Sequence, residues 1–168
     1  STFLPGEPGN KHDAFRDAHI PGARLFDIDK IADDETDLPH MVPTPAKFAR
    51  MVGALGVSND TRVVFYDQHG LRSSPRGWWM MRLFGHDKVA VLDGGLPAWK
   101  KEGRPVESGQ APAPAPATFV PDFRAAKLKG IGDIKQIVVD GSALILDARA
   151  KGRFDGTPAE PRAGLPSG

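Results

Sequence analysis

Residues 62–92, RVVFYDQHGLRSSPRGWWMMRLFGHDKVAVL, decide the fold. They begin with RVVFY (62–66), a β-branched and aromatic run typical of a buried strand, and they end with a similar run, KVAVL (88–92). Between the two runs, a helix is predicted over 74–84, with Ser74 as its cap and proline at its first position. Strands that alternate with helices pair in parallel. We therefore expect an α/β fold with a parallel sheet flanked by helices.

The flanking sequence predicts further elements. A helix is expected from Pro45 to Leu55, because Thr44 can cap it and apolar residues recur at helical spacing up to the stop at Gly56. The other expected elements are a helical turn around 13–17, a strand at 23–28, a short helix at 96–101, a helix at 131–139 and a strand at 143–146.

The composition limits the chemistry. The 168 residues include 22 Lys or Arg, 21 Asp or Glu and no cysteine, so the net charge is +1. This balance gives no reason to expect nucleic acid or a membrane as a partner, and no apolar run approaches the roughly 20 residues of a membrane helix. Without cysteine, the chain itself cannot form disulfides, thiolate metal sites or a cysteine nucleophile. Residues 1–10 lack the features of a signal peptide, so we expect a cytoplasmic location.

A change in composition suggests two domains. Residues 110–118, QAPAPAPAT, alternate alanine with proline, which favours an extended spacer. We expect a nearly complete first domain at 1–108, a linker at 109–123 and the start of a second domain at 124–168. The second domain is expected to be incomplete, because one helix and one strand cannot bury their own apolar faces.

The loop at 67–73, DQHGLRS, joins a predicted strand to a predicted helix. Its backbone N–H groups and the helix dipole could gather an anion, with Arg72 adding a positive charge. A polar turn after a buried strand is the ordinary alternative. Asp67 favours that alternative, because its carboxylate would repel an anion at the centre of the loop.

Two further clusters carry polar side chains. His19, His40 and the acidic residues of 27–37 form a His/carboxylate neighbourhood, but their spacing matches no metal-ligand pattern, and we expect neither a metal nor another cofactor. Arginines 149, 153 and 162 follow the strand expected at 143–146, and arginine suits bidentate binding of a carboxylate. A solvated charged loop is the alternative interpretation of this second cluster.

A set of short motifs occurs in a defined order along the chain. They are HIPGA (19–23), FDID (26–29), LPHM (38–41), YD (66–67), SPRGWWM (74–80), FGH (84–86) and LDGGLPAW (92–99). Together they resemble the tandem rhodanese-domain sulfurtransferases, closest to the 3-mercaptopyruvate sulfurtransferases, over essentially the whole sequence. Residues 146–162 resemble the opening of the second rhodanese domain in those enzymes.

The resemblance implies a division of labour between two domains. In the family, a cysteine of the second domain takes sulfur from 3-mercaptopyruvate or thiosulfate as a persulfide and passes it to a thiol or cyanide. The first domain is a silent copy, and Asp67 matches the aspartate that stands in the place of the cysteine. Its loop is therefore vestigial. Arg72 and Ser73 depart from the pattern, since they resemble an active loop where silent domains often have an aromatic residue.

The resemblance also implies roles for four other residues. Arg153 and Arg162 match the arginines that hold the carboxylate and carbonyl of mercaptopyruvate. Asp29 and His40 match members of a Ser-His-Asp relay, in which the carboxylate orients the imidazole and the imidazole moves a proton. Family members extend beyond both ends of this sequence, so we expect a fragment that is inactive without its C-terminal catalytic portion. The alternative is a stand-alone, non-catalytic rhodanese-like module that binds a partner or a small anion through Arg72 and its loop.

Overall fold

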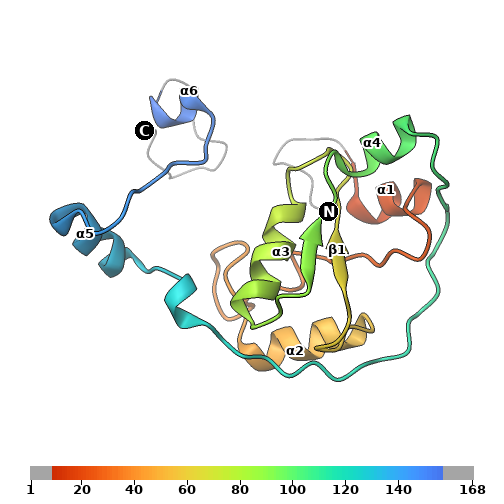
Figure 1. Ribbon diagram of the computed structural model, residues 1–168, viewed down its shortest axis with the longest axis horizontal. Coiled ribbons are helices and arrows are strands. Elements are labelled where there is room, and N and C mark those ends of the chain that lie inside the picture. The colour runs from red at the N-terminus through yellow and green to blue at the C-terminus, as the bar shows by residue number, and fades with distance from the viewer. Residues whose placement is uncertain (1–8, 157–168) are drawn as a thin grey trace. The chain divides into compact units, whose positions relative to one another are not determined.

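Two compact units make up the chain, and the boundary between them falls between Leu128 and Lys129. The computed structural model describes residues 9–156. Its elements are α1 (Lys11–Asp17), α2 (Pro45–Ala54), β1 (Val63–Phe65), α3 (Ser74–Leu83), β2 (Val89–Val91), α4 (Gly95–Lys101), the 3-10 helix η1 (Ala125–Lys127), α5 (Ile131–Asp140) and α6 (Lys151–Phe154) (Figure 1). Within the described part of the chain, no helix is both long and apolar enough to span a membrane.

The two strands of the first unit form a parallel sheet, as predicted. Val63 is paired with Val89 and Phe65 with Val91. The ladder is anchored at one end by the N–H of Val63, which donates to the carbonyl of Lys88 at 2.9 Å. Both strands are shorter than predicted by one residue at each end, but the strand–helix–strand order is confirmed and the fold is mixed α/β.

Helix α3 packs on both strands of this sheet (Figure 1). Its Gly77 lies so close to the ring of Phe65 that a Cβ there would come within 2.4 Å of it, so glycine allows the helix to approach β1. Phe84, which follows α3, stacks on Phe48 of α2 with ring centroids 4.0 Å apart. The main core lies between these two helices, and its buried apolar side chains are Ile31, Phe48, Val52, Met80, Met81, Leu83, Phe84 and Phe119.

Helix α2 forms for the local reasons that the sequence suggested. The hydroxyl of Thr44 accepts a hydrogen bond from the N–H of Lys47, and proline occupies the start of the helix. Past its C-terminal end, Gly56 adopts a positive φ of 80°, a conformation that glycine reaches without steric cost.

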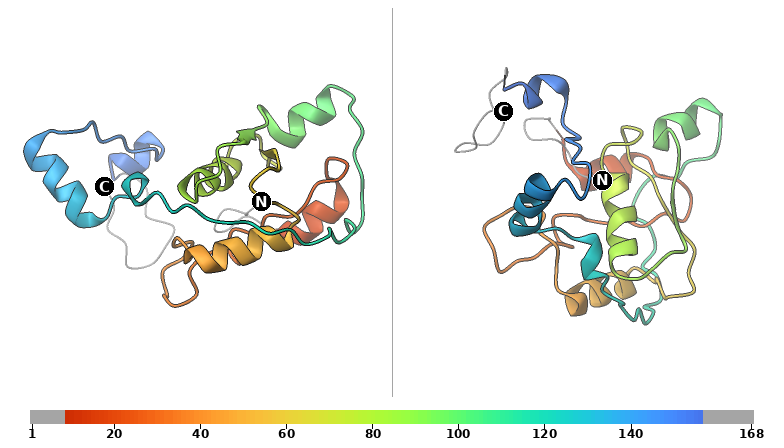
Figure 2. Two further views of the ribbon diagram at one scale, coloured as in Figure 1. Left: turned by 60° about the horizontal axis from the view of Figure 1, so that its bottom comes forward. Right: turned by 60° about the vertical axis from the view of Figure 1, so that its left-hand side comes forward.

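An extended segment after α4 runs along the first unit and passes α2 (Figure 2). The N–H of Ala117 donates to the carbonyl of Gly53 at 2.9 Å, and Phe119 inserts its ring into the core with 5% exposure. Further along, the N–H of Asp122 donates to the carbonyl of Phe84 at 3.0 Å. The later part of the expected linker is therefore built into the first unit.

Two of the predicted strands are wrong. Residues 23–28 form no ladder within the described part of the chain, although several of them line the same cavity as β1. Residues 143–146 also form no strand, and Leu144 and Leu146 are 84% and 79% exposed. Both runs have the composition of a strand, but a strand exists only where a neighbour accepts and donates its backbone hydrogen bonds.

Candidate functional site

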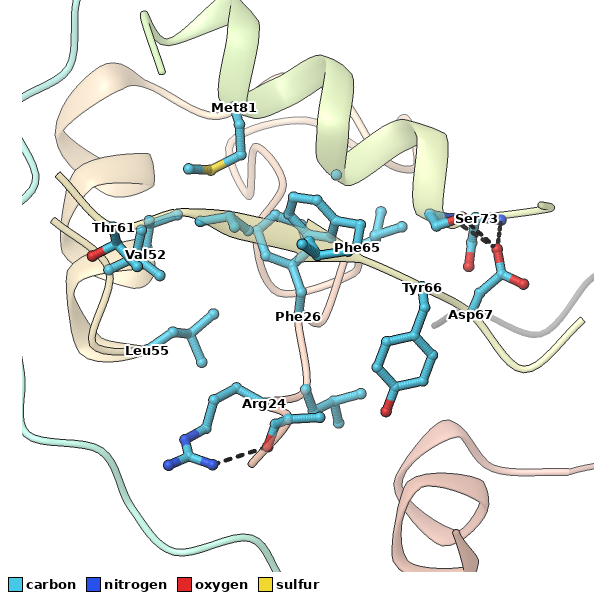
Figure 3. Close-up of a pocket in the computed structure, with 18 of the residues that line it drawn as sticks. Arg24, Phe26, Val52, Leu55, Thr61, Phe65, Tyr66, Asp67, Ser73 and Met81 are labelled. Carbon is cyan, nitrogen blue, oxygen red and sulfur yellow. Dashed lines mark hydrogen bonds between the residues drawn. The ribbon is translucent and has the colours of Figure 1, made fainter. Parts of the chain in front are cut away.

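The carboxylate of Asp67 fills the loop that joins β1 to α3. Its Oδ2 atom accepts hydrogen bonds from the N–H groups of Ser73 and Ser74 and from the hydroxyl of Ser74, each at 2.9 Å (Figure 3). It also accepts one from the N–H of Arg72 at 2.9 Å. Its Oδ1 atom accepts from the N–H of His69 at 2.9 Å. The Asp67 side chain is buried, and it provides the acceptor for the N–H groups at the start of α3.

The predicted cap of α3 is corrected by this arrangement. The helix begins at Ser74, so its cap position is Ser73, whose side chain makes no capping hydrogen bond. Asp67, seven residues before the first helical residue, provides the capping acceptor instead and carries a full negative charge. The loop does gather an anion as its N–H groups suggested, but the anion is a side chain of the loop itself.

Hydrogen bonding keeps Asp67 ionised. Burial would raise the pKa of its carboxyl group, but the N–H donors of the loop and the hydroxyl of Ser74 outweigh burial and lower the pKa to about 2. The loop is further held by α4, where the N–H of Leu96 donates to the carbonyl of Asp67 at 3.0 Å. A Cβ on Gly95 would come within 2.6 Å of that same carbonyl oxygen, so glycine permits the close contact.

Asp29 and His40, the two residues that the resemblance assigned to a relay, lie together in the structure. The Nε2 atom of His40 is 2.5 Å from Oδ1 of Asp29, so the carboxylate can orient the imidazole. His40 has a φ of 58°, and it is the one residue other than glycine with positive φ in the described range 9–156. Its carbonyl accepts a hydrogen bond from Nη2 of Arg76 at 2.5 Å, which ties this unusual backbone conformation to α3.

Two further charged residues surround Asp29. Lys11, from α1, contacts the carboxylates of both Asp27 and Asp29. Burial would raise the pKa of Asp29, but its hydrogen bonds to Lys11 and His40 outweigh burial and lower that pKa. Sequence reasoning missed Lys11, because it lies 16 and 18 residues before its partners and no local pattern connects them.

Arg76 was also missed as a site residue, although it lies in one of the quoted motifs. Its guanidinium lies over the ring of Trp79, 4.7 Å from the centroid, and burial lowers its pKa. The only signal in the sequence was the position of the arginine between the predicted helix cap and the tryptophan pair. That position does not reveal that Arg76 donates to the carbonyl of His40.

The arginine cluster belongs to the second unit. Arg153 lies on the short helix α6, and Arg149 forms an ion pair with Asp147 at 2.7 Å. Arg162 lies outside the described residues. Arg72 is an exposed residue that contributes its backbone N–H to the Asp67 carboxylate. The roles of these arginines stay predictions.

A largely apolar cavity of about 310 Å³ lies between residues 22–28 and β1 (Figure 3). Phe26 and Phe65 meet edge to face within it, with centroids 5.1 Å apart. Tyr66 also lines the cavity, and its hydroxyl accepts a hydrogen bond from the N–H of Ile20 at 3.1 Å. In the described residues, no group of three or more His, Asp or Glu side chains is placed to hold a metal ion.

Residues 10–102, more than half of the chain, match the family described as Rhodanese-like domain. The chain belongs to this family. Among curated relatives, the rhodanese-like chain is 41% identical to "Thiosulfate/3-mercaptopyruvate sulfurtransferase 1, mitochondrial" of Arabidopsis thaliana and 43% identical to the "3-mercaptopyruvate sulfurtransferase" of Homo sapiens. Both alignments include the entire chain, which spans 50% and 57% of the length of these relatives.

Solved structures support the same fold. SseA from Escherichia coli, a 3-mercaptopyruvate sulfotransferase with the rhodanese fold, superposes with a TM-score of 0.84 at 36% identity. The match covers 96% of the rhodanese-like chain and 62% of SseA. The predicted family and fold class are therefore confirmed.

Proposed function

We propose that the chain is the non-catalytic rhodanese domain, together with the start of the catalytic domain, of a 3-mercaptopyruvate or thiosulfate sulfurtransferase. The observation that carries this proposal is the Asp67 carboxylate, which occupies the N–H groups of the β1–α3 loop. A loop filled in this way has no cysteine nucleophile, and the N–H groups at the start of α3 already donate to a carboxylate rather than to the anion of a persulfide. The reacting cysteine is then supplied by a part of the protein outside these 168 residues, which contain none.

In the proposed reaction, the cysteine thiolate attacks the sulfur atom of 3-mercaptopyruvate. A sulfur–sulfur bond forms, the carbon–sulfur bond breaks, and its electron pair leaves with pyruvate as an enolate that takes up a proton. A thiol or cyanide then attacks the outer sulfur of the persulfide and frees the cysteine. Arg153 and Arg162 hold the carboxylate and carbonyl of the donor, since guanidinium groups form paired, charge-assisted hydrogen bonds with such oxygens.

The pair formed by Asp29 and His40 supplies proton transfer in this proposal. The carboxylate of Asp29 faces Nε2 of His40 and favours the tautomer with a proton on that nitrogen. Nδ1 is then the nitrogen that exchanges a proton with a serine of the cysteine loop. An oriented imidazole in this position accelerates a reaction by about 10² to 10⁴.

A stand-alone module that binds a small anion in the β1–α3 loop is less well supported. The N–H groups that such an anion would need already donate to Asp67, whose low pKa keeps it charged at neutral pH. A second anion at this position would face that charge in a buried environment.

Sulfurtransferase assays of two variants test the proposal in the longer, cysteine-bearing protein. We expect His40→Asn and Asp29→Asn to lower kcat with 3-mercaptopyruvate as the donor, each by at least about tenfold. His69→Asn is the matched control, because His69 is an exposed histidine of the β1–α3 loop. Wild-type activity in both variants would overturn the relay, and absence of any sulfurtransferase activity in the wild-type protein would overturn the proposed function.

A further inference from the structure

Lys11 is a mostly buried cation next to the proposed relay. Its side chain is 14% exposed, and its Nζ atom contacts Oδ1 of Asp27 and Oδ2 of Asp29. The two carboxylates raise the pKa of Lys11, although burial alone would lower it. Lys11 is therefore charged at neutral pH.

The two oxygens of Asp29 have different partners. Oδ2 faces Lys11, whereas Oδ1 faces Nε2 of His40 at 2.5 Å. The backbone N–H of Asp29 donates to Oδ1 of Asp27 at 3.1 Å, and Asp27 is itself held by Lys11. Lys11 therefore fixes both the side chain of Asp29 and the turn that carries it.

We propose that Lys11 is a positioning residue for proton transfer by His40: it holds Oδ2 of Asp29 so that Oδ1 faces the imidazole. This role rests on the proposed function, since it matters for catalysis only if Asp29 and His40 form the relay. Nothing in the first 20 residues of the sequence distinguished Lys11, which became visible only through the contacts of α1.

The charges around Asp29 explain why a cation is needed there. From its own turn, Asp29 faces the buried carboxylate of Asp27, whose Oδ2 atom has no hydrogen-bond partner and lies 3.6 Å from Nε2 of His12. Lys11 faces Asp29 from α1, and His40 faces it from the loop before α2. Without Lys11, two neighbouring carboxylates would be left with histidines as their partners. The repulsion between the two carboxylates would raise the pKa of Asp29, and the side chain of Asp29 would be free to rotate.

Three variants separate a positioning role from a merely structural one. Lys11→Met removes the charge, and Lys11→Arg retains it and can still contact both carboxylates. Lys47→Met is the matched control, because Lys47 has the same 14% exposure but pairs with Asp34, at 2.9 Å, instead of with Asp27 and Asp29. Backbone NMR spectra of the three variants report whether each remains folded.

The first measurement is an NMR titration of the Asp29 carboxyl group in the 168-residue chain. We expect Lys11→Met to raise the pKa of Asp29, Lys11→Arg to restore it, and Lys47→Met to leave it unchanged. An unchanged titration in Lys11→Met would overturn the proposal. If Lys11→Met does not fold, Lys11→Arg decides the question. A folded Lys11→Arg variant in which the pKa of Asp29 is no longer lowered and His40 no longer contacts Asp29, despite the retained charge, would also overturn the proposal.

The second measurement is the pH dependence of kcat and KM in the longer, cysteine-bearing protein. Loss of one charge-assisted contact predicts a fall in kcat of about tenfold for Lys11→Met, with an acidic limb displaced to higher pH and little change in KM. Equal profiles for Lys11→Met and Lys47→Met would overturn the positioning role. If the wild-type protein has no sulfurtransferase activity, the proposed function fails, whereas the titration still decides whether Lys11 positions Asp29.

Discussion

Replacement of Asp67 by asparagine removes a buried charge with little change in shape. The side-chain oxygen of the asparagine can still accept from the N–H groups of Ser73 and Ser74. Its NH₂ group, however, faces the N–H of His69, which in the wild-type chain donates to Oδ1 of Asp67. The variant therefore loses the negative charge at the start of α3 and one hydrogen bond. Both losses destabilise the first unit.

The size of the effect follows from the pKa of Asp67. Its fall from 3.8 to about 2 corresponds to a preference of about 2.4 kcal/mol for the ionised form in the folded chain. We expect Asp67→Asn to lower the free energy of unfolding by about 2–3 kcal/mol at pH 7. Because the folded pKa lies below the unfolded one, this contribution is complete above about pH 5 and is lost as the pH falls toward 2.

Urea denaturation followed by tryptophan fluorescence measures this effect, since Trp78 and Trp79 lie on α3 next to the loop. Asp60→Asn is the control, because Asp60 is 95% exposed and pairs with Lys88 on the surface. We expect the control to unfold near the wild-type midpoint, and the difference between wild type and Asp67→Asn to shrink on acidification. Equal stability of Asp67→Asn and wild type at pH 7, or a difference that does not depend on pH, would refute the reasoning.

Three further predictions concern the donor site, the extended segment and the core. In the longer, cysteine-bearing protein, Arg153→Ala and Arg162→Ala should each lower kcat/KM for 3-mercaptopyruvate by about tenfold to a hundredfold, since each removes a charge-assisted contact; unchanged kinetics would contradict the assignment. Gly53→Ala should lower the free energy of unfolding by about 1–3 kcal/mol, because the new Cβ would lie 2.4 Å from the carbonyl oxygen of Ala117; a Tm equal to that of wild type would show that the extended segment is not packed there. Phe48→Ala should cost about 3–5 kcal/mol, because Phe48 is completely buried and stacks on the ring that follows α3; a loss below 1 kcal/mol in urea denaturation would contradict the described core.

The elements that could be predicted from sequence are those whose causes are local. Helix α2 follows from the cap at Thr44 and the apolar spacing behind it, and the strands β1 and β2 follow from short β-branched runs with a helix between them. The run at 23–28 is short and rich in apolar residues, as β1 is, but forms no strand. Its conformation depends on a backbone partner, which no property of the run itself can supply.

The candidate site was predictable only in part. Asp29 and His40 were paired by resemblance to a family, and the structure places Nε2 and Oδ1 within hydrogen-bond distance. Lys11 and Arg76 contact them from α1 and α3, across 18 and 36 residues of sequence. Such contacts arise from the packing of distant elements, so residue spacing gives no indication of them.

The loop after β1 reconciles two sequence expectations that pointed in opposite directions. Its N–H groups were predicted to favour an anion, and Asp67 was predicted to oppose one. The structure satisfies both statements, because the Asp67 carboxylate is the group that accepts those N–H bonds. A side chain that would repel an external anion thus completes the cap of α3.

Mass spectrometry of the intact protein after incubation with 3-mercaptopyruvate tests most directly whether the reacting cysteine lies outside this chain. The longer protein and the 168-residue chain are treated in parallel and measured before and after addition of cyanide. We predict that the longer protein gains one sulfur atom, which cyanide removes, and that the 168-residue chain gains none. Sulfur bound by the 168-residue chain, or no sulfur bound by the longer protein, would contradict the proposed function.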